Sequence, residues 1–172
     1  MVYPGSSQAW TTTILFWKLP IAPALVQPTS RGHVRLASAD WRHAPIIEGN
    51  HLGTDRDLAA IVRAIELARE LGSKAALDSV REAEVVPGPK ATNRQDLIDL
   101  ARTAAASFGH PVGTARIGTG ADAVVDSELR VHGLRGLRVA DASVMPSIIS
   151  GPTNAPAFMI GGRAAGLITV AR

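Results

Sequence analysis

Apolar residues recur at helical spacing in three stretches of this 172-residue chain. The first stretch follows Thr54, and Asp57, three residues later, gives a pattern close to a capping box. Gly72 is a C-terminal stop signal. The apolar positions are Leu58, Ile61, Val62, Ile65 and either Ala68 or Leu71. The spacing predicts an amphipathic helix that begins at Thr54 and ends at Gly72.

The second helical stretch begins after Thr92 or Asn93, either of which suits an N-cap. A shorter helix is predicted before it, over residues 76–82, and a clear break at Pro87–Pro89 separates the two. The apolar positions of the second stretch are Leu97, Ile98, Ala101, Ala104 and Ala105. This helix leads the chain directly to Phe108 and the loop that follows it.

The third helical stretch runs from about Ala155 to Val170. Either Thr153 or Asn154 can cap it, and Pro156 suits its first turn. Three glycines weaken this helix intrinsically, which favours close packing against another backbone.

Alternation with a period of two predicts strands in the remaining segments. In residues 33–37, Val34 and Leu36 lie on one face, which predicts a half-buried strand. Pro20 and Pro23 restrict any strand near them to an edge or an interrupted position. The other predicted strands are Thr11–Phe16, Ala24–Gln27, Ile46–Ile47, Thr114–Ile117, Val124–Val125, Leu129–Val131 and Leu137–Ala140. The pattern predicts an α+β fold, with a mixed or antiparallel sheet and helices on one face.

Composition narrows the class of protein. The hydrophobic content of 46% is too high for a disordered chain, and the length is enough for one domain with a core. The net charge is +3, but the basic residues are scattered singly, which disfavours nucleic-acid binding. Cysteine is absent, so neither disulfides nor thiolate chemistry are available. The longest apolar stretch, residues 13–26, is interrupted by Lys18 and two prolines, and we expect a cytoplasmic protein with no membrane partner.

Candidate chemistry gathers in the C-terminal third of the chain. The predicted strand Leu137–Ala140 runs into a turn of small residues, Asp141–Ser143, and a Pro/Gly/Ser-rich loop then leads to a helix N-terminus at Thr153. A small-residue turn and a helix N-terminus both offer backbone N–H groups to an electron-rich ligand. Upstream, His110 stands in a Gly/Pro-rich loop, where an imidazole with a pKa near 6.5 suits proton exchange at neutral pH.

Four motifs in these segments occur in an order and spacing that resemble one known family. They are HPVGTARIG at 110–118, AVVDSELRVHG at 123–133, LRVADASVMP at 137–146 and TNAP at 153–156. A softer resemblance extends back to PTSRGHVRL at 28–36. The chain is therefore similar, over most of its length from about position 28, to the C-terminal portion of the glucose–methanol–choline (GMC) flavin oxidoreductases.

The resemblance implies an FAD-dependent oxidation of a small-molecule alcohol to an aldehyde or ketone. It assigns His110 as the general base, which takes the hydroxyl proton while hydride passes to the flavin. It implies that the flavin contacts the backbone at Asp141, Ala142 and residues 153–155, that is Thr153, Asn154 and Ala155. The other histidine of the motifs, His132, is interpreted as structural. The remaining histidines, His33, His43 and His51, show no metal-ligand spacing, which disfavours a zinc site.

Two positions depart from the family pattern. The second substrate-holding residue, His or Asn in the family, aligns with Pro152, whose side chain can neither donate nor accept a hydrogen bond. Asn154 either takes that catalytic role or only caps the helix. The second departure is Gly109, where many relatives carry an aromatic residue.

The resemblance also sets the expected organisation of the chain. Residues 1–27 form an N-terminal extension of the substrate domain, 28–108 a substrate-binding cap region, and 109–172 the active-site loop with the last strand and helix of a flavin-binding domain. No GxGxxG turn is present, so we interpret the chain as a fragment of a larger enzyme that needs the N-terminal flavin domain to bind FAD tightly.

Two alternatives to a catalytic role for this chain remain. The chain is an inactive remnant of such an enzyme, or it is a piece that works only with an N-terminal partner chain. A Ser-His-Asp hydrolase is disfavoured because no GxSxG motif occurs.

Overall fold

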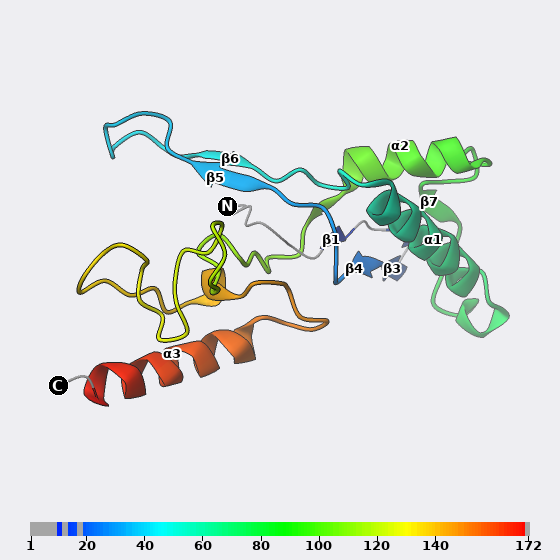
Figure 1. The fold of residues 1–172 in the computed structure, drawn as a ribbon. Helices are drawn as coiled ribbons and strands as arrows, with labels where there is room; N and C mark the ends of the chain where they lie inside the picture. The colour runs from blue at the N-terminus through cyan, green and yellow to red at the C-terminus, as the bar shows by residue number, and fades with distance from the viewer. Residues whose placement is uncertain (1–9, 12–13, 17–18, 171–172) are drawn as a thin grey trace. The chain divides into compact units, whose positions relative to one another are not determined.

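The computed structural model of this chain describes residues 10–11, 14–16 and 19–170 (Figure 1). These residues form two compact units, each continuous in space but not in sequence. We call residues 10–30 and 50–108 the helical unit, and residues 31–49 and 109–170 the C-terminal unit. The predicted α+β class is confirmed, but the single predicted sheet is replaced by three small antiparallel sheets.

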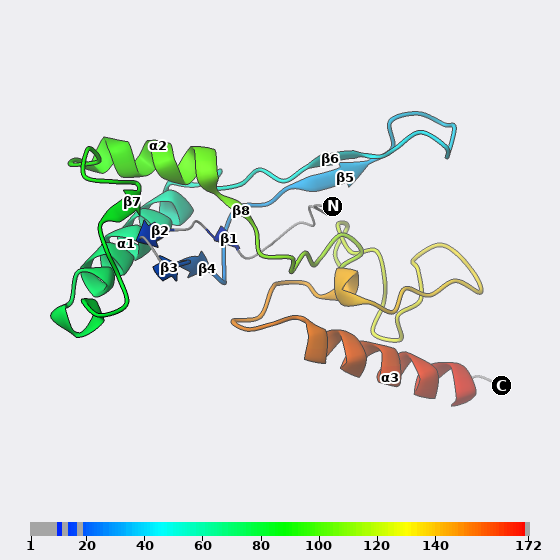
Figure 2. The same ribbon diagram turned by 180° about the vertical axis from the view of Figure 1, so that it is seen from behind.

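Two helices form the core of the helical unit. Helix α1 spans Asp55–Gly72 and helix α2 spans Arg94–Ala104, and the two pack side by side (Figures 1 and 2). The apolar face of α1 that the sequence predicts is buried, with Ile61, Val62 and Ile65 at 0% exposure. Leu97 and Ala101 of α2 complete the same cluster. Both helices therefore form where hydrophobic periodicity places them, because one face of each is removed from water.

The ends of both helices follow the predicted capping residues. The side chain of Thr54 accepts a hydrogen bond from the amide of Asp57, and that of Asn93 accepts one from Asp96. Asn93 and Asp96 form a complete capping box. Gly72 is the last residue of α1, but the next residue, Ser73, has right-handed helical angles, so the helix ends without a left-handed glycine cap.

Two three-stranded antiparallel sheets lie against α1. In one, the order is β4 (Ala24–Leu25), β1 (Trp10–Thr11) and β8 (Ala106–Ser107). In the other, the order is β3 (Leu19–Ile21), β2 (Ile14–Phe16) and β7 (Glu84–Val86). Pro20 lies in the edge strand β3, as its missing N–H requires. The predicted strand Thr11–Phe16 is divided between β1 and β2, and its residues 12–13 lie outside the described part of the chain.

The short helix predicted over residues 76–82 is wrong. Only a single 3₁₀ turn, η1 (Ala75–Leu77), forms there. Of residues 76–82, only Leu77 and Arg81 are partly buried, and the others are exposed. A helix this short needs an apolar face to bury, and here Leu77 is only partly buried and Val80 is 51% exposed.

The C-terminal unit contains one hairpin and one long helix. Strands β5 (His33–Arg35) and β6 (Ile46–Glu48) pair antiparallel with His33 opposite Glu48. The prediction of a half-buried strand is wrong, since Val34 is 43% and Leu36 is 78% exposed. These two strands form a two-stranded sheet by themselves, and all three residues of β5 are exposed. Helix α3 spans Asn154–Val170, close to the predicted bounds.

The four short strands predicted after His110 do not form as strands. Among the described residues, isolated bridges form there instead, between Ile117 and Val125, Val125 and Val131, and Arg130 and Arg138. Tight turns interrupt the pairing, and Leu129, Gly133 and Gly136 have positive φ angles of 64°, 76° and 76°. The last predicted strand, residues 137–140, is thus an extended segment with one bridge. Whether it belongs to a flavin-binding domain stays a prediction.

No helix in the described ranges is long and apolar enough to cross a bilayer.

A buried carboxylate, Asp57, ties α1 to the segment that precedes β5. Its side chain is 1% exposed and accepts hydrogen bonds from the amides of Thr29 and Ser30 and from both of their hydroxyls. Burial alone raises the pKa of Asp57, but these hydrogen bonds outweigh burial and hold the pKa below the ordinary value of 3.8.

Replacement of Asp57 should lower the stability of the helical unit. Asp57→Asn removes the charge and turns part of the acceptor set into a donor, which should cost about 3 kcal/mol of unfolding free energy at pH 7. Because the folded pKa is depressed, the stabilisation is present above the unfolded pKa and is lost as the pH falls through the folded pKa. Denaturant titrations at pH 7, 5 and 3 should show a steeper acid loss in the unmodified chain than in Asp57→Asn.

Asp55→Asn is the matched control, because Asp55 lies in the same helical turn but is exposed. It should change stability by less than about 1 kcal/mol. Equal acid sensitivity of the unmodified chain and Asp57→Asn would contradict the role given to Asp57.

Candidate functional site

Backbone hydrogen bonds join two segments of the C-terminal unit. One is the loop of the first motif, residues 110–118, which we call the histidine loop, and the other is the turn of small residues at 141–143. The amide of Ala115 donates to the carbonyl oxygen of Ser143 at 3.0 Å, and that of Ile117 donates to Val144 at 2.8 Å. Residues 142–144 form the 3₁₀ turn η2 (Ala142–Val144), which also packs against α3. The structure therefore brings together the first, third and fourth sequence motifs in one unit.

The second motif is held to the first in the same way. The amide of Gly118 donates to Val125 at 3.0 Å, and that of Val124 donates to Arg116 at 2.9 Å. The ring Nε2 of His132 lies 3.0 Å from the carbonyl oxygen of Gly118. The interpretation of His132 as a structural residue agrees with this contact. Near it, hydrogen bonds from Arg130, the backbone amide first, hold the pKa of Asp126 below its ordinary value.

His110 lies in a loop whose following residues are firmly anchored. The residue is partly buried, and Gly109, with φ of +77°, precedes it. Val112, two residues later, is 1% exposed. With Pro111 restricting the chain between them, the backbone that carries His110 has little freedom on its C-terminal side.

Asp141 is the N-cap of η2. Its Oδ1 accepts a hydrogen bond from the amide of Ser143 at 2.7 Å, and the residue is otherwise exposed. Ala142, the next predicted cofactor contact, is partly buried in the first position of η2. These two residues lie directly before the carbonyl groups that receive the histidine loop.

The start of α3 carries the other predicted site residues. The amide of Ala157 donates to the carbonyl oxygen of Thr153 at 3.0 Å, so the buried Thr153 occupies the N-cap position and Asn154 is the first helical residue. Asn154 and Ala155 are exposed, and within the described residues neither amide has an acceptor. Pro156 has no N–H to satisfy, as expected for the first turn.

An apolar cavity of about 270 Å³ lies between the motifs and α3. Ile117, Leu129, Val144 and Met145 form one side of it, and Ile160 of α3 contributes to the other. None of the predicted site residues lines this cavity. The sequence carries no distinct signal for it, because its walls are ordinary apolar residues of the motifs.

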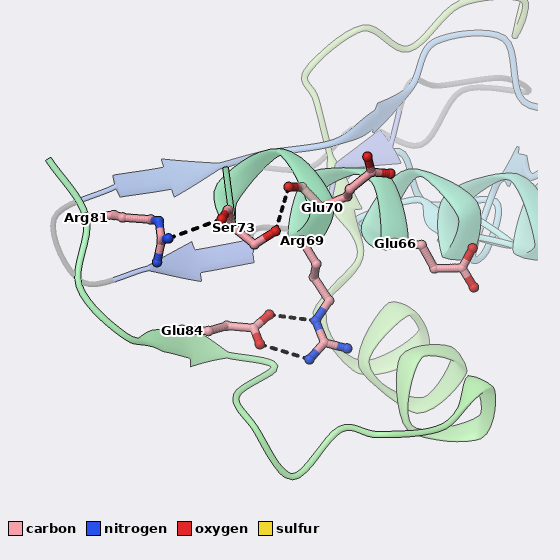
Figure 3. Close-up of a pocket in the computed structure, with 6 residues that line it drawn as sticks. All are labelled: Glu66, Arg69, Glu70, Ser73, Arg81 and Glu84. Carbon is pink, nitrogen blue, oxygen red and sulfur yellow. Dashed lines mark hydrogen bonds and ion pairs between the residues drawn. The ribbon is translucent and has the colours of Figure 1, made fainter. Parts of the chain in front are cut away.

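A second hollow, of about 520 Å³, lies in the helical unit, far along the sequence from the motifs (Figure 3). Two ion pairs hold charged side chains of this hollow: Nε and Nη2 of Arg69 donate to the two carboxylate oxygens of Glu84 at 2.8 and 2.9 Å, and Lys74, outside the lining, binds Glu70 at 2.9 Å. The hydrogen bond from Lys74 holds the pKa of Glu70 below its ordinary value. Arg69, Glu70 and Glu84 thus each have a partner of opposite charge.

Among the described residues, no three histidine or carboxylate side chains gather in a way that could hold a metal ion.

Comparison with known proteins identifies the class. The sequence model of the family described as GMC oxidoreductase matches residues 28–161. The chain therefore belongs to the GMC oxidoreductase family, the family that its four motifs resemble.

Individual relatives agree with this assignment. The oxygen-dependent choline dehydrogenase of Escherichia coli O45:K1 is 43% identical over 139 residues, which are 81% of this chain and 25% of the relative. The alcohol dehydrogenase [acceptor] of Pseudomonas putida is 38% identical over 141 residues, 82% of this chain and 26% of the relative. This chain thus spans about a quarter of the length of the curated relatives it matches.

Solved structures share the fold. Pyridoxine 4-oxidase from Mesorbium loti matches with a TM-score of 0.78 and 36% identity, over 83% of this chain and 28% of that structure. Formate oxidase from Aspergillus oryzae RIB40, a structure described for its FAD modification, matches with a TM-score of 0.81 and 31% identity, over 90% of this chain and 27% of that structure.

The outer surface of α3 is unusually apolar for a helix in water. Phe158 is 76% and Val170 is 88% exposed. No atom of the described residues lies within 4 Å of an added Cβ at Gly161, Gly162 or Gly166, so these residues do not supply the close packing that the sequence led us to expect there.

This surface should bind a dye that fluoresces on apolar protein surfaces. The double variant Phe158→Ser, Val170→Ser should clearly lower the fluorescence of the bound dye without changing the unfolding free energy by more than about 0.5 kcal/mol. Trp41→Ser is the control, because Trp41 is 80% exposed but lies at the tip of the β5–β6 hairpin. Dye binding that survives the double variant would place the apolar surface elsewhere.

Proposed function

We propose that this chain is the C-terminal portion of an FAD-dependent oxidoreductase that oxidises a small-molecule alcohol to an aldehyde or ketone. The observation that carries the proposal is the pair of hydrogen bonds that holds the loop of His110 against the turn of Asp141. These bonds keep the proton acceptor, His110, in the same compact unit as the backbone N–H groups of Asn154 and Ala155. Oxidation of an alcohol needs one group that takes the proton and another site that receives the hydride.

The chain's residues suit contact with a flavin. The amides of Asn154 and Ala155 have no acceptor among the described residues, and they stand at the N-terminus of a 17-residue helix. Such a terminus carries roughly half a positive charge, which favours an electron-rich group. Bound FAD would supply the hydride acceptor. The residues that would hold it are Asp141 and Ala142, through their backbone, together with Thr153, Asn154 and Ala155.

His110 would accept the proton of the substrate hydroxyl at a ring nitrogen. A neutral imidazole at neutral pH has one unprotonated nitrogen for this purpose. The anchored loop on its C-terminal side limits how far the ring can move from a productive position.

Asn154 would orient the substrate oxygen beside His110. By the resemblance, Pro152 stands where the family has a side chain with hydrogen-bonding capacity. Asn154, two residues later in the sequence, offers a side-chain amide group. The N-cap position belongs to Thr153, which leaves the exposed side chain of Asn154 available for this role.

A second candidate is a domain with no catalysis of its own. The chain spans about a quarter of its curated relatives and has no GxGxxG turn, which favours dependence on an N-terminal flavin-domain partner chain. An inactive remnant would have the same appearance. The experiment that separates these candidates restores the rest of the enzyme.

His110→Ala should abolish most of the activity of a complete enzyme. Residues 28–161 of this chain replace the matching segment of the E. coli choline dehydrogenase, and the rate of flavin reduction by an alcohol is followed in a stopped-flow spectrophotometer. His110→Ala should reduce this rate by about 10²–10⁴-fold, as expected for a positioned general base. The FAD content should stay unchanged, because the histidine is proposed to contact the substrate.

His132→Ala is the control for this experiment. It removes one ring contact to Gly118 and should lower stability by about 1 kcal/mol while the rate per folded molecule holds. The assignment of His110 fails if His110→Ala reduces flavin at the unmodified rate. A chimaera that holds FAD and never reduces it with any small alcohol would instead support the non-catalytic candidate.

Asn154→Ala decides how the chain compensates for Pro152. If Asn154 orients the substrate oxygen, flavin reduction should slow by about 10-fold or more, while the melting temperature stays within about 1 °C because the residue is not the cap. Thr153→Ala is the comparison and should lower stability by about 1 kcal/mol through loss of the cap. An unchanged rate in Asn154→Ala would remove this residue from the site.

A further inference from the structure

The side chain of Asp141 contacts the backbone of its own turn, and this contact leads by an unbroken series of hydrogen bonds to the histidine loop. Its Oδ1 accepts the amide of Ser143 at 2.7 Å, and its carbonyl oxygen accepts the amide of Val144 at 3.2 Å. Together these two bonds close the 3₁₀ turn η2.

The carbonyl oxygens of that turn point to the other motif. Ser143 accepts the amide of Ala115 at 3.0 Å, and Val144 accepts the amide of Ile117 at 2.8 Å. These carbonyl groups lie where the loop needs them only while η2 keeps its shape. A three-residue 3₁₀ turn has poor hydrogen-bond geometry of its own, so a side-chain cap contributes much of what holds it.

Apolar side chains at the C-terminal end of η2 also hold the turn in place. Val144 is 3% and Met145 is 7% exposed, and both line the apolar cavity under α3. The buried side chains fix the position of the turn, whereas the Asp141 cap fixes its internal shape. No other polar side chain of η2 has a hydrogen bond within the described residues, since Ser143 contributes only backbone groups.

We propose that Asp141 is a positioning residue for His110, acting through η2 and the backbone of residues 115–117. Its catalytic consequence rests on the proposed function, but its structural consequence does not. The side chain would thus serve the histidine loop, while only the backbone of the same residue would face the cofactor.

Residue-resolved hydrogen exchange of the 172-residue chain, followed by NMR, tests this proposal. In Asp141→Ala, the amides of Ala115 and Ile117 should exchange about tenfold faster, as loss of one hydrogen bond implies. In Asp141→Asn they should exchange nearly as in the unmodified chain, because the amide oxygen of asparagine can accept the same bond from Ser143. The amide of His132, which donates to Val124, is the internal reference and should change little.

Asp40→Ala is the matched control. Asp40 makes the same type of contact, with its Oδ1 accepting the amide of Arg42 at 3.0 Å, but it lies in the hairpin of the same unit. It should leave Ala115 and Ile117 unchanged. The proposal is overturned if Asp141→Ala leaves these amides protected, if Asp141→Asn exchanges as fast as Asp141→Ala, or if protection falls uniformly over residues 109–170.

The catalytic consequence is measured in the chimaera described above. Asp141→Ala should slow flavin reduction and shift its pH dependence, and Asp141→Asn should restore both. If exchange responds as expected but His110→Ala retains the full rate, the proposed function fails and the positioning of the loop stands. If His110→Ala is inactive while Asp141→Ala keeps the unmodified rate and pH profile, the positioning role fails and the proposed function stands.

Discussion

Two backbone hydrogen bonds, from Ala115 to Ser143 and from Ile117 to Val144, join the loop that follows His110 to η2 in the C-terminal unit. Within the part of the chain that the structure describes, residues 109–153 form isolated bridges and one 3₁₀ turn, with no continuous strand ladder. In such a structure each backbone bond between distant segments fixes a large loop, because buried main-chain groups must find partners somewhere. The candidate site is therefore a set of loops held by a few specific contacts and by the apolar packing of Val112, Val125 and Val144.

The helical unit is held differently, by a cluster of apolar side chains and one buried carboxylate. Asp57 has four neutral donors from Thr29 and Ser30 and no cation beside it. These two residues are the last of the helical unit before the chain enters the C-terminal unit at Arg31. The carboxylate thus binds α1 to the last two residues before the chain passes into the C-terminal unit. Thr54, the cap of α1, adds a hydrogen bond to Thr29 at 2.8 Å.

Local signals in the sequence predicted the helices well and the short strands poorly. Thr54 and Asn93 correctly predicted where α1 and α2 begin, because capping and apolar periodicity act within a few residues. The pairs around Val125 and Arg138 were misjudged, since alternation cannot show that a turn at Leu129 or Gly133 will interrupt the pairing. The contact of residues 115–117 with 143–144 spans more than 25 positions and left no local signal. The family resemblance, and not periodicity, pointed to those segments as parts of one site.

An amino-acid substitution in the site can alter a side chain without altering the backbone N–H groups. A helix N-terminus presents its first N–H groups whatever side chains precede it, so Pro152 leaves the donors of Asn154 and Ala155 in place. By the resemblance, the same proline stands where a substrate-holding side chain is expected. In the proposed function, the contact with the flavin would survive this change, whereas the contact with the substrate alcohol would move to Asn154. The departure at Pro152 therefore concerns which alcohol fits beside His110 and does not argue against the flavin chemistry of the family.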